Sequence, residues 1–152
     1  MKESLWHHRL LEKLLLLFLF FLTIGEFSAW GSQSVKYVLS LMFNVITLST
    51  PADVLIGVLG MAASAMVFAG SALQWKQFPR AWKFMRVGSL LFMIKKVFDV
   101  VNVMWLFKLS HPSAVPGDIE TLAKGLGTEF FGLAFWMFIF FYFRHVARKE
   151  KK

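Results

Sequence analysis

The sequence contains no cysteine, and this absence removes several kinds of chemistry. Without a thiol the chain forms no disulfide and supplies neither a thiolate metal ligand nor a cysteine nucleophile. Familiar catalytic motifs are missing as well: there is no Gly-x-Ser-x-Gly, no His-Glu-x-x-His and no glycine-rich phosphate loop. We therefore predict that the protein is not an enzyme.

Charged residues are also scarce, at 17% of the chain, whereas soluble domains usually carry about 25%. Hydrophobic residues make up 57% and the mean hydropathy is +0.60. This composition disfavours a water-soluble fold. The net charge of +8 comes from basic residues at the ends of apolar runs, where they set orientation and meet anionic headgroups. The expected partner is thus the lipid bilayer, and no nucleic acid is expected.

Four apolar segments are each long enough to cross the hydrocarbon core, which takes about 20 residues as a helix. They run over about 10–29, 52–73, 84–107 and 122–143. The spans use so much of the chain that no connection could fold as a soluble domain. The sequence therefore predicts an all-α fold, an integral membrane four-helix bundle that forms a single transmembrane domain over residues 1–152.

The distribution of lysine and arginine predicts the orientation of this bundle, because cytoplasmic connections retain basic residues. Twelve of the 17 basic residues lie in or beside the two ends of the chain and the connection between the second and third spans. Only three lie on the opposite side. We expect cytoplasmic N- and C-termini, in a plasma membrane or a bacterial inner membrane.

Residues from about 35 to 48 are apolar but too few to cross a bilayer. Lys36, Ser40, Asn44 and Thr47 recur along one stripe of this segment at helical spacing. Such a stripe is typical of a short amphipathic helix in the outer interface. An extension of a neighbouring helix explains the pattern equally well.

Small residues indicate how the helices pack, because helices in lipid associate through close contact rather than through hydrophobicity. Two stripes of small residues on the second span place that helix among several neighbours, and the fourth span has a shorter stripe. The candidate packing residues are Gly57, Gly60, Ala62, Ser64, Ala65, Ala69, Ala72 and Gly132.

The third predicted span carries ionisable residues at membrane depth, which cost at least about 2.5 kcal/mol each to insert. Counting inward from the predicted membrane faces brings acids of the first and fourth spans to a similar depth. The predicted intramembrane cluster consists of Glu26, Lys95, Lys96, Asp99, Asn102 and Glu129. One interpretation is a polar cavity that binds an ion, a proton or a polar headgroup. The other is a salt-bridge network that orients the helices or meets a partner subunit.

The positions of histidine exclude one kind of cofactor site, and the positions of tryptophan fit the predicted span ends. All four histidines lie outside the predicted spans, so facing helices cannot hold a haem between two histidines. We expect no metal site and no cofactor. Five of the six tryptophans, Trp30 among them, fall near predicted interfaces and are typical of an aromatic belt. Arg86 is expected to extend to the cytoplasmic interface.

These features favour a non-enzymatic membrane protein that acts as a subunit or an oligomerising component of a larger membrane complex, including a homo-oligomer. The alternative is a compact ion- or proton-coupled transporter or channel that uses the intramembrane cluster. A lipid-handling membrane enzyme is a weaker third hypothesis, because it needs a substrate pocket that a sequence does not display.

Overall fold

The computed structural model of the chain describes residues 2–42, 51–76, 78, 80–110 and 116–149. These residues form four helices: α1 (Lys2–Met42), α2 (Pro51–Trp75), α3 (Ala81–Ser110) and α4 (Pro116–Lys149). No strand occurs within those ranges. The predicted all-α fold is confirmed.

Two of these helices are long and apolar enough to cross a membrane, among the residues that the structure describes. The qualifying stretches are Val54–Trp75 of α2, with a mean hydropathy of 2.0, and Pro116–Val146 of α4, with 1.6. They contain most or all of the predicted spans 52–73 and 122–143. The crossing of the membrane by these two helices and by α1 and α3, and hence the four-span topology, stays a prediction.

The first helix is longer than its predicted span and continues to Met42. Residues 35–42 of the predicted interfacial segment therefore belong to α1. This agrees with the interpretation of the segment as an extension of a neighbouring helix. The remaining part of that segment, 43–48, lies outside the described residues.

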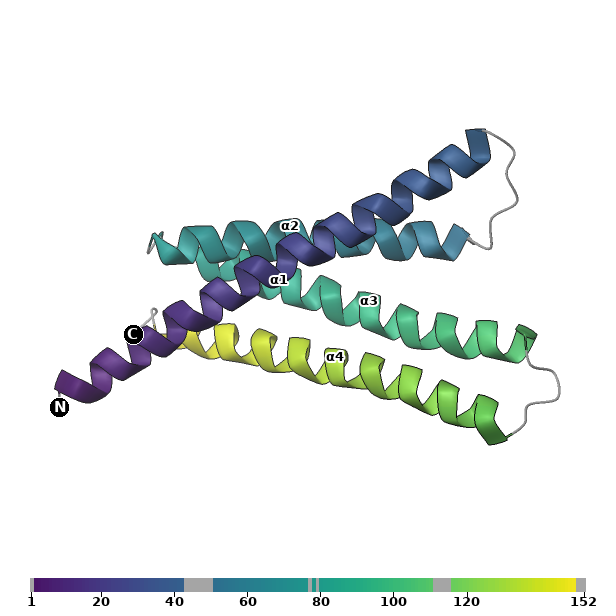
Figure 1. Cartoon of the computed structure of the whole chain (residues 1–152). Helices are drawn as coiled ribbons and strands as arrows, with labels where there is room; N and C mark the ends of the chain where they lie inside the picture. The colour runs from purple at the N-terminus through teal and green to yellow at the C-terminus, as the bar shows by residue number, and fades with distance from the viewer. Residues whose placement is uncertain (1, 43–50, 77, 79, 111–115, 150–152) are drawn as a thin grey trace.

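Each helix packs against the next one along the chain: α1 on α2, α2 on α3 and α3 on α4. Helix α1 crosses the others diagonally, and its first turns lie at the same end of the array as the last turns of α4 (Figure 1). Toward the opposite end, the α1–α2 pair diverges from the α3–α4 pair (Figure 1). The array is therefore closed at one end and open at the other.

The apolar core lies in the closed part, where all four helices contribute side chains. Its fully buried members are Leu19, Ala63, Val67, Met85, Ile139 and Phe143. Phe92 of α3 and Trp136 of α4 stack at the open side of this core, with ring centroids 4.0 Å apart and planes 8° from parallel. The charged residues of α3 begin within one turn of this aromatic pair.

Two glycines set the close approach of α2 and α3. A Cβ at Gly88 would lie 2.5 Å from Val67 Cγ2 and 2.9 Å from the Val67 backbone nitrogen, and one at Gly70 would lie 2.9 Å from the backbone nitrogen of Met85. Only glycine lets the backbones meet this closely, which is how helices pack tightly in lipid.

The small residues predicted to pack lie on several sides of α2. Gly57, Gly60 and Ser64 are buried, and a Cβ at Gly60 would lie 2.8 Å from Trp30 Cδ1 of α1. The alanines are more open: Ala62 and Ala65 are exposed. Partial burial is found at Ala69 and Ala72.

Candidate functional site

The charged residues of α3 form an ion pair within their own helix. Lys95 and Asp99 are four residues apart, so they lie on the same face one turn from each other. The Lys95 Nζ is 2.7 Å from the Asp99 Oδ2, and the Lys95 side chain is only 1% exposed. A lysine this deeply buried needs a nearby anion, and Asp99 supplies it.

Lys96 connects this pair to α4. Its Nζ lies 2.6 Å from the Glu129 Oε2 and 3.6 Å from the Asp99 Oδ2. Asp99 therefore contacts both lysines, and the four side chains form one continuous network that crosses from α3 to α4. We call Lys95, Lys96, Asp99 and Glu129 the ion-pair network; its two cations and two anions balance.

Gly132 provides the space through which Lys96 reaches Glu129. A Cβ at position 132 would lie 2.9 Å from the Cε of Lys96 and 3.4 Å from its Nζ. Glycine and glutamate stand three residues apart on α4, so they share a face of that helix. The sequence marked Gly132 as a packing residue, and the structure shows that what packs on it is the lysine side chain.

Glu26 reaches the network through Trp30, one turn further along α1. The indole Nε1 donates a 2.6 Å hydrogen bond to the Glu26 Oε2. On the other side, the Lys95 Nζ lies 3.8 Å from the centroid of the same indole, in a cation–π contact. Asn102, the last predicted member, lies one turn beyond Asp99 on the same face of α3 and is partly buried.

Sequence reasoning missed the role of Trp30. A tryptophan near a span end is typical of an interfacial belt, and this general pattern hid the specific contact. The signal available was its spacing of four residues from Glu26, which places indole and carboxylate on one helix face. The buried Gly60 opposite then lets the indole pack against the α2 backbone.

Arg86 has contacts that the sequence did not indicate. The guanidinium carbon lies 5.6 Å from the Trp82 ring centroid and 5.5 Å from that of Phe140. Contacts of this kind favour arginine, because its planar cation stacks on aromatic faces. The residue thus links α3 to α4 near the closed end, in addition to the ion-pair network further along.

Metal ligation finds no support in the described parts of the chain, where no three histidine or acidic residues gather closely enough to hold a metal ion. Comparison with models of protein families, with curated proteins and with solved structures finds no match to this chain. The interpretation of its function rests on the geometry of the network.

A larger side chain at position 132 should break the contact between Lys96 and Glu129. We expect Gly132→Leu to lower the free energy of unfolding by about 2 kcal/mol, because the leucine occupies the space of the lysine and separates the buried charges. Reversible unfolding in mixed micelles, followed by circular dichroism, measures this change.

The matched control is Gly127→Leu on the same helix, where an added Cβ has nothing within 4 Å. This variant should be as stable as the wild type or slightly more stable, because leucine favours a helix over glycine. Equal destabilisation by both leucines would show that the lysine contact at position 132 has no special effect.

Proposed function

We propose that this protein is a non-enzymatic four-span membrane protein, with both termini in the cytoplasm, that acts as a subunit or an oligomerising component of a membrane assembly. The observation that carries the proposal is the pairing of the intramembrane charges. Both lysines have an acid within 2.7 Å, and one of these pairs joins α3 to α4. Charges arranged in this way orient helices.

The energetic reason is the cost of isolated charge in hydrocarbon, which keeps ionisable side chains in contact with protein or with one another. A transporter or a lipid-handling enzyme would instead use groups that are open to a hydrated path or a substrate. The nearly complete burial of Lys95, at 1% exposed, favours a structural role for the network over these alternatives, as expected of a non-enzymatic component of an assembly.

The apolar surface gives the second line of support. The accessible surface is 10756 Å², whereas a compact soluble protein of this mass has roughly 7,900 Å². Large aromatic side chains stand on it; on α4, Phe131 is 77% exposed and Phe138 is 60% exposed. Lipid covers such a surface, and so does a partner chain, which makes α4 a suitable element for assembly.

The proposed topology predicts which side of the membrane each connection faces. Because the chain has no cysteine, single cysteines can be introduced as unique labels. We expect Ser4→Cys and Phe78→Cys to react with an impermeant maleimide only in inside-out vesicles. Ser113→Cys should react only in right-side-out vesicles. Labelling of positions 78 and 113 from the same side would refute the four-span topology.

The proposed assembly role predicts that the protein is not an isolated monomer in a bilayer. Light scattering from nanodisc-embedded protein, corrected for lipid and scaffold, should give at least two chains of 17.5 kDa, or one chain with a stoichiometric partner purified alongside it. Chemical crosslinking in native membranes, before any detergent is added, provides the control for dissociation during purification. A single chain without a partner in both measurements would contradict the proposal.

A further inference from the structure

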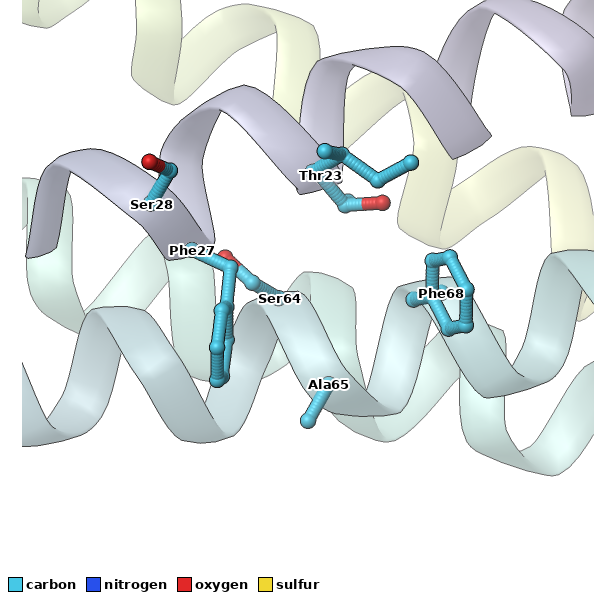
Figure 2. Close-up of a pocket in the computed structure, with 7 residues that line it drawn as sticks. Thr23, Phe27, Ser28, Ser64, Ala65 and Phe68 are labelled. Carbon is cyan, nitrogen blue, oxygen red and sulfur yellow. The ribbon is translucent and has the colours of Figure 1, made fainter. Parts of the chain in front are cut away.

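A pocket lies between α1 and α2, away from the ion-pair network. Its volume is about 450 Å³, within the range of small-molecule sites. Figure 2 shows side chains of both helices around it. The lining residues are Thr23, Ile24, Phe27, Ser28, Ser64, Ala65 and Phe68.

The Ser64 hydroxyl at this pocket lacks the hydrogen bond that the other buried hydroxyls make. The Ser64 Oγ is buried without a hydrogen-bond partner, and its residue is 0% exposed. By contrast, Thr23 donates to the Leu19 carbonyl at 2.8 Å and Ser89 to the Met85 carbonyl at 2.7 Å. A buried hydroxyl without a partner is costly, so a ligand that accepts its proton relieves that cost.

The open side of the pocket faces outward from the array. Ile24, Phe27 and Phe68 at its edge are 45%, 50% and 39% exposed. In the proposed topology this side meets hydrocarbon, so a ligand enters from the bilayer and not from water. The Ser64 Oγ is itself buried, so a ligand reaches it only when a side chain at the edge of the pocket moves.

The depth of Ser64 limits the class of ligand. The residue lies at the middle of the apolar stretch Val54–Trp75, so its hydroxyl lies near the bilayer midplane if α2 spans. The polar groups of a phospholipid stay near the interface. A matching ligand therefore carries its hydrogen-bond acceptor on an apolar body that dissolves in the hydrocarbon core.

We propose that the pocket between α1 and α2 binds a lipophilic carbonyl compound, whose oxygen accepts a hydrogen bond from the Ser64 hydroxyl while its apolar body packs between Phe27 and Phe68. The pocket walls supply the apolar contacts and Ser64 supplies the specificity, which is the usual division in small-molecule sites. This inference rests on the membrane placement proposed above but not on the assembly role.

The test uses protein in nanodiscs and two radiolabelled probes of similar shape. Menadione is a lipophilic quinone with two carbonyl groups, and methylnaphthalene is its counterpart without oxygen. The quinone has no thiol to react with, because the chain lacks cysteine. We expect saturable binding of menadione, about tenfold tighter than that of methylnaphthalene, from one hydrogen bond to a buried hydroxyl.

Three variants separate the contributions. Ser64→Ala should weaken menadione binding about tenfold and leave methylnaphthalene unchanged, because only the hydrogen bond is lost. Ala65→Phe should fill the pocket and abolish the binding of both probes. Ala62→Phe is the matched control, since Ala62 is exposed on the same helix but does not line the pocket; both probes should bind as they do to the wild type.

Other outcomes overturn the proposal. Retention of menadione equal to that of empty nanodiscs, or unaffected by Ala65→Phe, would refute the pocket as its site. An unchanged affinity in Ser64→Ala would refute the hydrogen bond. A phospholipid that copurifies with the wild type and is lost in Ala65→Phe would make an acyl chain the occupant instead. Failure to insert into nanodiscs would refute the membrane placement as well, whereas insertion without saturable binding refutes only the pocket proposal.

Discussion

The ion pair between Lys96 of α3 and Glu129 of α4 is the interaction on which the proposed intramembrane arrangement depends. The two charged atoms lie 2.6 Å apart, and both side chains are largely buried, at 16% and 20% exposed. In the proposed topology an unpaired charge at membrane depth costs about 2.5 to 3.5 kcal/mol, so the need to pair Lys96 with Glu129 favours this position of α3 against α4. Lys95 then depends on Asp99, which also contacts Lys96.

The network also explains where the apolar core stops. Core side chains from four helices fill the closed part of the array, and the Phe92–Trp136 stack forms the boundary of this region. Beyond it the α1–α2 pair diverges from the α3–α4 pair (Figure 1), whereas α3 stays packed on α4 and the Lys96–Glu129 ion pair joins them. Trp30 contributes from α1: its indole bonds to Glu26 and lies under Lys95. In the proposed assembly, the outward apolar surface is left to lipid and to partner chains.

The sequence predicted the helical fold and the gathering of charge better than it predicted specific contacts. Spacing alone places Lys95 and Asp99 on one face, and comparing depths brings Glu129 near Asp99 or Asn102, because both inferences need only helix geometry. The pairing of Glu129 with Lys96 is seen only in the structure. The contact of Trp30 with Lys95 depends on how α1 crosses α2. Helical periodicity in the sequence does not reveal that crossing. Gly70 and Gly88 likewise look like ordinary small residues until the crossing of α2 and α3 places a backbone against each of them. The extent of α1 beyond its apolar stretch also depends on structure, since Gly31 and Ser32 are typical of a helix end and the helix nevertheless continues to Met42.

The most direct test of the central claim exchanges the two charges of the interhelical pair. The account predicts that Lys96→Glu and Glu129→Lys each lower the free energy of unfolding by about 3 kcal/mol, because each leaves like charges together in a buried site. The double variant should recover part of that loss, because positions 96 and 129 attract each other again while the new acid at position 96 still lies beside Asp99. Lys124→Gln, which removes an exposed ion pair with Glu120 on α4, should have no measurable effect. Unfolding in mixed micelles compares these four variants with the wild type, and single variants as stable as the wild type, or a double variant without recovery, would contradict the account.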